Sequence, residues 1–211
     1  MKRYNILILL LALLSPLALT SCSEDENTVE EFPDWQNRNE TYFNNIYEQA
    51  RANTDGNWKL FLNYSLEDTI PTDTYDYIAV EVLTEGTGSG CPMYTDSVLV
   101  NYRGRLIPST SYADGYVFDE SYEGEYNPAT AMPAQLYVGG VVDGFATALQ
   151  HMHIGDHWRV YIPYQLGYGV SGTTSIPGYS TLIFDIALIA YYRAGVSPGP
   201  WRSAESGWIT E

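Results

Sequence analysis

The stretch VGGVVDGFATALQHMHIGDHWRVYIPYQLGYG, residues 138–169, changes its periodicity part-way along and thereby indicates the fold. Residues 141–150 have the apolar spacing of a short helix. Gly155 and Asp156 then predict a turn, and residues 157–164 alternate between apolar and polar side chains as a β-strand does. This part of the chain therefore predicts a short helix followed by a strand of a sheet.

All three histidines of the chain, His151, His153 and His157, lie in this stretch, which raises the question of a metal or acid–base site. Residues two apart at a helix end do not face each other, and the pair 153 and 157 straddles the turn. A metal site needs ligands at compatible angles and supporting hydrogen bonds, which this spacing does not promise. We predict that the histidines belong to the scaffold, with no metal and no cofactor; a metal site is the alternative.

Further segments with a period of two predict more strands on both sides of this stretch. Gly, Pro and Asp residues separate them, as expected of turns. Many strands and one short internal helix predict an α+β domain with an antiparallel sheet. The predicted strands are residues 58–62, 77–83, 97–107, 115–121, 134–139, 157–164 and 181–192.

An amphipathic helix is predicted ahead of the strands, over about residues 34–53, with Asp34 as its N-cap. Aromatic and apolar side chains recur along it near helical spacing. This face must pack either on the domain that follows or on a second copy of the chain.

The N-terminus has the pattern of an export signal. Lys2 and Arg3 precede an apolar run, and small residues follow before Cys22. Residues 19–22, LTSC, resemble a bacterial lipobox, in which cleavage leaves an acylated cysteine that anchors the protein to a membrane. Cys91 is then the one remaining cysteine, which excludes an intrachain disulfide in the mature chain.

The composition limits the partners. The 211 residues carry a formal net charge of -16, which disfavours binding to nucleic acid. We expect a signal peptide (1–21), a lipidated flexible tether (22–33), an accessory segment of helix and strand (34–76), one domain (77–193) and a C-terminal tail (194–211) on which Trp201 and Trp208 dock.

The sequence contains no nucleophile elbow, no paired cysteines and no phosphate-binding loop. Instead, aromatic residues stand beside polar or glycine residues on the predicted strands and loops. They are Tyr102, Phe118 before Asp119, Tyr168 before Gly169, and Phe184 before Asp185.

Four fragments in this order resemble the FKBP-type peptidyl-prolyl cis-trans isomerases, the family that binds macrolide immunosuppressants: VLVNYRGRL, VFDES, residues 138–169, and SIPGYSTLIFDIAL. The resemblance runs from about Tyr77 to Tyr192. It implies a curved antiparallel sheet wrapped around the short helix, with the active site in the hollow between them.

The resemblance also implies roles for individual residues. Phe145 would form the pocket floor under the substrate proline, where many relatives have tryptophan. Tyr102, Phe118 and Phe184 match aromatic walls, Asp119 matches the pocket carboxylate, and Tyr168 matches a hydroxyl donor. Substrate-binding positions are Val141, Val142, Leu136 and Ile176, the last on a loop over the pocket. The chain departs from the family where Ala134 and Leu136 replace two aromatics, which lowers or rebuilds the rim.

Isomerisation of an X-Pro bond needs no bond to be broken, so an apolar pocket that favours the twisted amide is sufficient. For Asp119, a direct electrostatic effect on the amide and a structural hydrogen bond to Tyr102 or an arginine are both open. The sequence thus predicts an envelope-anchored prolyl isomerase whose partners are proline-containing peptides or unfolded exported proteins. The alternatives are a catalytically weak peptide-binding chaperone or scaffold and a surface glycan-binding lipoprotein.

Overall fold

The computed structural model describes residues 29–67, 73–201, 203 and 207–211. The predicted signal peptide, Cys22 and most of the predicted tether lie outside these residues. Among the described residues, no helix is long and apolar enough to cross a membrane. The ranges of the helices and strands are α2 Trp35–Ala52, β1 Trp58–Leu62, β2 Tyr77–Thr84, β3 Ser97–Arg105, β4 Val117–Glu120, β5 Ala134–Tyr137, α3 Asp143–Leu149, β6 His157–Ile162 and β7 Leu182–Tyr192.

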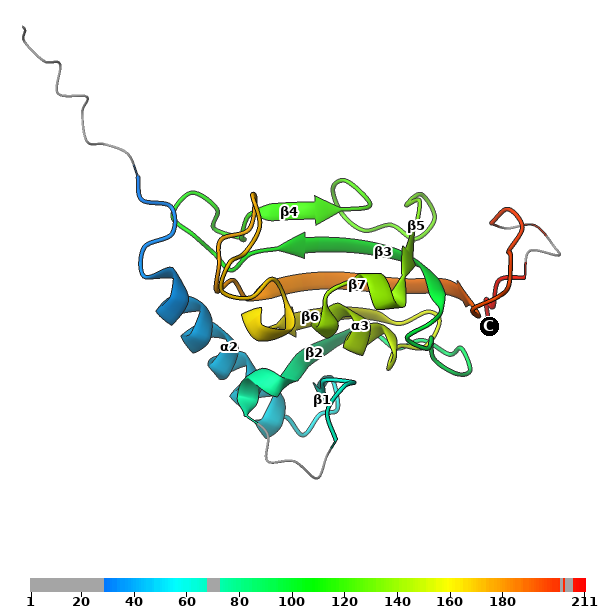
Figure 1. Cartoon of the computed structure of the whole chain (residues 1–211), viewed down its shortest axis with the longest axis horizontal. Coiled ribbons are helices and arrows are strands. Elements are labelled where there is room, and N and C mark those ends of the chain that lie inside the picture. The colour runs from blue at the N-terminus through cyan, green and yellow to red at the C-terminus, as the bar shows by residue number, and fades with distance from the viewer. Residues whose placement is uncertain (1–28, 68–72, 202, 204–206) are drawn as a thin grey trace, which may run out of the picture. The chain divides into compact units, whose positions relative to one another are not determined.

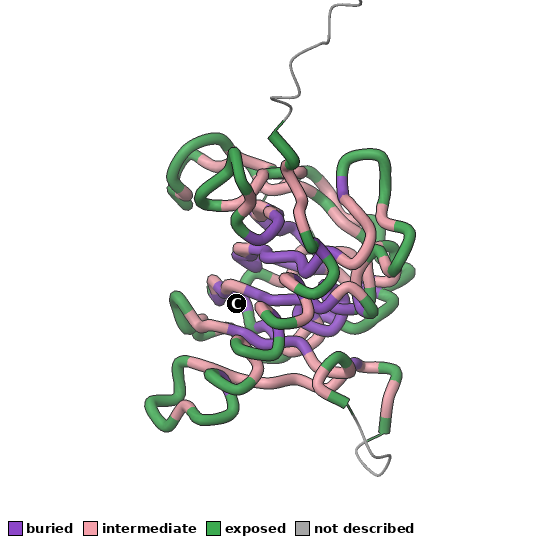
Figure 2. Tube along the Cα trace, turned by 90° about the vertical axis from the view of Figure 1, so that its left-hand side faces the viewer, coloured by how far each residue is buried: buried purple, intermediate pink, exposed green. Residues whose placement is uncertain are grey.

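The seven strands form one antiparallel sheet in the order β1-β2-β6-β7-β3-β4, and β5 also pairs with β3 (Figure 1). β4 and β5 pair with different parts of β3, so both lie along the same edge of that strand. The long strands β7 and β3 pair with each other, and their residues are largely buried. The buried residues gather in the interior of the molecule (Figure 2). The predicted α+β class and antiparallel sheet are confirmed.

The two helices pack on opposite faces of the sheet. The strand register places Val80, Val160 and Phe184 side by side on one face, since Val160 pairs with both of the others. Phe145 of α3 packs on this face, with its ring centroid 5.0 Å from that of Phe184. Neighbouring residues of a strand point to opposite faces, so Tyr161 faces the other side, where Tyr42 of α2 contacts it.

α2 packs on the sheet of its own chain. Of the two partners expected for its aromatic face, the domain that follows and a second copy of the chain, the structure shows the first. Trp35 and Phe43 are buried, and the indole Nε1 of Trp35 donates to Ser180 Oγ at 2.9 Å. Asp34 occupies the predicted N-cap position, but its side chain bonds no helix amide. It accepts instead from the side chain of Asn37, because Asp34 adopts a left-handed conformation.

Three short 3₁₀ helices connect the strands: η1 (Thr74–Asp76), η2 (Val138–Gly140) and η3 (Tyr164–Leu166). The C-terminal segment, predicted to lack regular structure, adds a β-bridge between Ile209 and Tyr191. Beside it, the ring of Trp208 lies 4.7 Å from that of Tyr192, as expected of a docked tryptophan. Residues Glu31–Glu211 form one compact unit, so the accessory segment and the tail pack together with the rest of the sheet.

Candidate active site

A cavity of about 340 Å³ lies between α3 and the face of the sheet on which this helix packs. Side chains from β3, β7 and α3 form its inner wall, and residues on both sides of η2 form one side of it. Its lining residues are Tyr102, Asp119, Leu136, Gly140, Val141, Val142, Phe145, Tyr168 and Phe184.

Three aromatic rings form the apolar base of the cavity. Phe145 contacts Phe184 edge-on, with centroids 5.0 Å apart, and Tyr102 edge-on at 6.1 Å. Phe145 and Phe184 are only 3% and 5% exposed, so surrounding core residues fix their positions. This arrangement gives the cavity a rigid apolar floor that can take a saturated ring.

Tyr102 and Asp119 are joined by a hydrogen bond at the edge of the cavity. The Tyr102 hydroxyl donates to Asp119 Oδ2 at 2.8 Å. Burial and this bond raise the pKa of Tyr102 to about 12, so its hydroxyl stays protonated at neutral pH. Asp119 itself is exposed, because it lies on the short edge strand β4. Asp119 therefore lines the cavity, as the resemblance implies, from an exposed position at its edge. Of the two roles left open for it, the structural hydrogen bond to Tyr102 is present.

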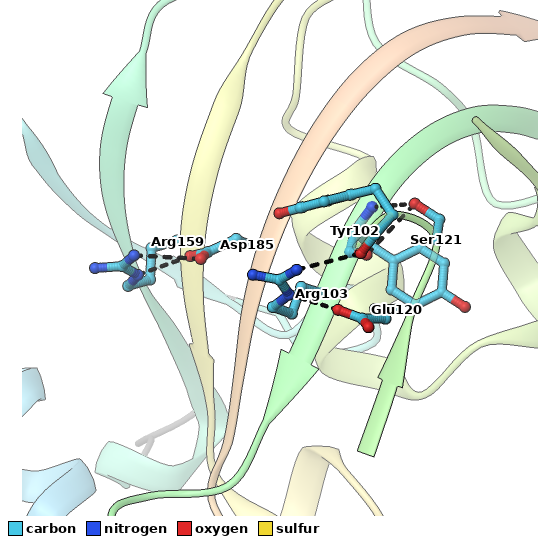
Figure 3. Close-up of polar contacts among 7 residues, drawn as sticks. Tyr102, Arg103, Glu120, Ser121, Arg159 and Asp185 are labelled. Carbon is cyan, nitrogen blue, oxygen red and sulfur yellow. Dashed lines mark hydrogen bonds and ion pairs between the residues drawn. The ribbon is translucent and has the colours of Figure 1, made fainter. Parts of the chain in front are cut away.

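A hydrogen bond joins the main chain of Tyr102 to the segment after β4. This bond fixes the position of this part of β3 beside the cavity. Its N–H donates to Ser121 Oγ at 2.9 Å (Figure 3). The next residue, Arg103, points to the opposite face of the sheet and pairs there with Glu120. Arg159 and Asp185 form a second ion pair, in which Arg159 Nε and Asp185 Oδ1 are 2.7 Å apart. The strand alternation thus separates a charged outer face from the apolar cavity.

Tyr168 also lines the cavity, from the loop that follows η3. It is 39% exposed. Burial and the nearby charge of Asp119 raise the pKa of Tyr168, so the hydroxyl remains a donor at neutral pH. The loop is held by main-chain bonds such as that from Gly169 N–H to Tyr164 O at 2.8 Å, which position the ring next to the cavity.

Most of the predicted site residues line the cavity, and two of them, Phe118 and Ile176, do not. Val141 and Val142 are extended residues immediately before α3, and Leu136 is on β5. Phe118 lies behind Phe184, with centroids 5.4 Å apart. Ile176 is 3% exposed and is held in its own loop, where its N–H donates to Thr173 Oγ1.

Sequence reasoning missed Gly140, which lines the cavity and has no side chain to suggest a role. The pair Gly139–Gly140 directly before the two valines was the available signal, because glycine often marks a close approach of another chain to the backbone. The replaced rim position Ala134 is not among the lining residues, whereas Leu136 is.

The histidines do not line the cavity, and their contacts are those of scaffold residues. His151 Nδ1 lies 2.8 Å from Thr147 O, and its ring stacks on Phe61. His153 Nε2 lies 3.7 Å from Cys91 Sγ. Within the part of the chain that the structure describes, no three His, Cys, Asp or Glu side chains are placed to hold a metal ion, and Cys91 has no disulfide partner.

Residues 88–189 match the family model described as FKBP-type peptidyl-prolyl cis-trans isomerase. The chain is a member of this family over that range. The FKBP match contains every residue that lines the cavity, whereas α2 and β1 lie before it.

Curated relatives support the FKBP assignment. The chain is 41% identical over 114 residues to the macrophage infectivity potentiator of Trypanosoma cruzi, covering 54% of this chain and 52% of that one. It is 40% identical over 109 residues to the FKBP-type 22 kDa peptidyl-prolyl cis-trans isomerase of Escherichia coli, covering 51% and 47%. The chain thus spans about half the length of these two relatives.

Solved structures extend the similarity beyond the family match. A peptidyl-prolyl cis-trans isomerase from Pseudomonas syringae aligns with a TM-score of 0.52 at 28% identity, covering 74% of this chain and 95% of that one. FkpA from Escherichia coli aligns with a TM-score of 0.54 at 27% identity, covering 75% and 62%.

Proposed function

We propose that this chain is a peptidyl-prolyl cis-trans isomerase that acts on X-Pro bonds of exported proteins. One observation carries the proposal: Tyr102, Phe145 and Phe184 converge on a single cavity that has a hydroxyl and a carboxylate at its edges. This convergence favours a peptide-binding pocket over an exposed glycan-binding surface. The FKBP match over the residues of the cavity supports the same activity.

The chemistry follows from the electronic structure of the amide. Resonance opposes rotation of the peptide bond by roughly 18–20 kcal/mol, and rotation removes charge from the carbonyl oxygen. The twisted amide is therefore less polar than the planar one, and an apolar cavity binds it better than water does. This difference in binding lowers the barrier, whereas equal binding of both forms would not.

Individual residues contribute in different ways to this mechanism. Phe145 would lie under the proline ring and fix its position. Tyr168 would donate a hydrogen bond to a carbonyl of the flanking peptide, which holds the peptide still while the imide bond turns. Tyr102 would act through Asp119, because their hydrogen bond fixes the carboxylate at the edge. Lowering the barrier by about 5–6 kcal/mol would accelerate the reaction roughly ten-thousandfold.

We propose in addition that the protein is extracytoplasmic and is anchored to the cell envelope through a lipid on Cys22. The charged start, apolar run and lipobox-like residues 19–22 support this location. The Cys22→Ala variant should move from the membrane fraction to the soluble fraction of cells that express it. Retention of this variant in the membrane would refute the lipid anchor.

A protease-coupled assay on an X-Pro tetrapeptide tests the activity. The purified chain should accelerate cis-to-trans conversion, and a macrolide of the FKBP-binding class should inhibit it. Peptide binding without acceleration would instead identify the weak chaperone or scaffold, an outcome consistent with the altered rim at Leu136. Absence of both binding and acceleration would refute either use of the cavity.

A further inference from the structure

Three tyrosines from separate parts of the chain meet on the surface beside the cavity. Tyr64 follows β1, Tyr94 precedes β3 and Tyr137 ends β5. The rings of Tyr64 and Tyr94 stack with centroids 5.1 Å apart. Tyr94 and Tyr137 are 40% and 49% exposed, so both rings offer apolar area to solvent. We call these three residues the tyrosine platform.

The main chain of Gly139 and Gly140 lies between the tyrosine platform and the cavity. A Cβ atom on Gly139 would lie 2.9 Å from Cε1 of both Tyr94 and Tyr137, so these two rings flank this residue. Gly140, one position further, lines the cavity, and a Cβ atom there would lie 3.3 Å from Cδ1 of Tyr137. The two glycines thus separate the platform from the cavity with backbone alone. A peptide that leaves the cavity at this point would pass from the backbone of Gly140 onto the rings of Tyr94 and Tyr137.

The platform is attached to the helix that carries the cavity floor. The N–H of Tyr64 donates to Thr147 Oγ1 of α3 at 3.3 Å. Burial and hydrogen bonding to Tyr94 raise the pKa of Tyr64 to about 12, so it remains an uncharged ring. The Tyr94 hydroxyl in turn contacts Gly139 O at 3.5 Å. These contacts hold the rings in place before a ligand arrives, which reduces the entropy lost on binding.

We propose that the tyrosine platform is a second subsite, which takes an aromatic side chain of the same peptide whose proline occupies the cavity. This inference rests on the proposed function and adds a substrate preference to it. Ring faces that are already fixed and partly exposed favour stacking with another ring. Met93, which precedes Tyr94 in the chain, is 57% exposed.

The distance to the proline follows from chain geometry. Tyr137 lies against Gly140, which lines the cavity, so the two subsites adjoin. An extended peptide advances ~3.3 Å per residue, and the test therefore places the aromatic residue two or three positions from the proline. The platform is remote from the bond that rotates, and it therefore binds the planar and twisted forms equally. Its contribution should appear in KM or Kd and leave kcat unchanged.

The test uses proline hexapeptides in which phenylalanine or alanine stands two or three residues before or after the proline. Their KM values for isomerisation and their Kd values by fluorescence polarisation would both be measured. The wild-type chain should prefer phenylalanine at one of these positions by about tenfold. Tyr94→Ala and Tyr137→Ala, measured separately, should each reduce this preference to about twofold or less. Tyr112→Ala, which removes a ring of similar exposure outside the platform and the cavity, should retain it.

The outcomes distinguish the platform from the proposed function. Activity on all peptides without preference for phenylalanine would refute the platform and leave the isomerase intact. Preference in Kd without acceleration of any peptide would refute the isomerase and retain the platform. Unchanged preference in both alanine variants would overturn the inference.

Discussion

Replacing Phe145 by leucine tests whether the aromatic floor of the cavity is the source of catalysis. The substitution keeps an apolar side chain on α3 but removes the ring that meets Phe184 and Tyr102 edge-on. Two aromatic pairs at about 0.5–1.5 kcal/mol each predict a loss of about 1–3 kcal/mol in the free energy of unfolding. At about 2–4 °C per kcal/mol, Tm should fall by about 2–12 °C, which leaves the protein folded at assay temperature.

The expected effect on activity follows from the contact between the cavity floor and the proline ring. Burial of an apolar side chain contributes about 1.5–3 kcal/mol, and a proline ring on leucine would lose roughly half of the contact that it makes with phenylalanine. Since about 1.4 kcal/mol corresponds to a factor of ten, kcat/KM should fall about tenfold. The assay is protease-coupled isomerisation of an X-Pro tetrapeptide, with circular dichroism to confirm that the variant is folded.

Phe43→Leu provides a matched control. Phe43 is also 3% exposed, but it lies on α2 and does not line the cavity. This variant should lose stability and keep kcat/KM within about twofold, because its contacts are confined to the core. If Phe145→Leu retained full kcat/KM, or if Phe43→Leu lost as much, the aromatic floor would not be the source of catalysis.

Three other predictions follow from individual contacts. Gly144→Ala should lower the free energy of unfolding by about 1–3 kcal/mol in a denaturant titration, because the new Cβ would lie 2.3 Å from Ile162 Cγ2; an unchanged midpoint would contradict the close packing of α3. Burial lowers the pKa of His157 below its ordinary value of 6.5, so the unfolded state binds more protons and stability should decrease as pH falls below 6.5. His157→Gln should weaken this pH dependence in thermal scans at pH 5 and pH 7, and an identical dependence would exclude His157 as its source. His153→Ala should leave kcat/KM unchanged, since this residue does not line the cavity; loss of activity would refute its assignment to the scaffold.

Much of the architecture was predictable because it depends on local patterns. The period of two in residues 182–192 and the helical spacing in residues 35–52 reflect which side chains must face a core, whatever that core contains. The resemblance to FKBP-type isomerases supplied the identity of the cavity residues, since composition and spacing alone do not assign a role to Phe145 or Tyr168.

The sequence by itself determined the class of fold and the order of the strands along the chain, and through its resemblance to a family it indicated most of the side chains that line the cavity. Only the tertiary structure decided that α2 packs on its own sheet, that Asp119 is exposed on an edge strand, and that Tyr64 and Tyr94 stack. The physical reason is that these features depend on contacts between residues far apart in the chain. Such contacts are set by the pairing and the two faces of the sheet, which no local periodicity encodes.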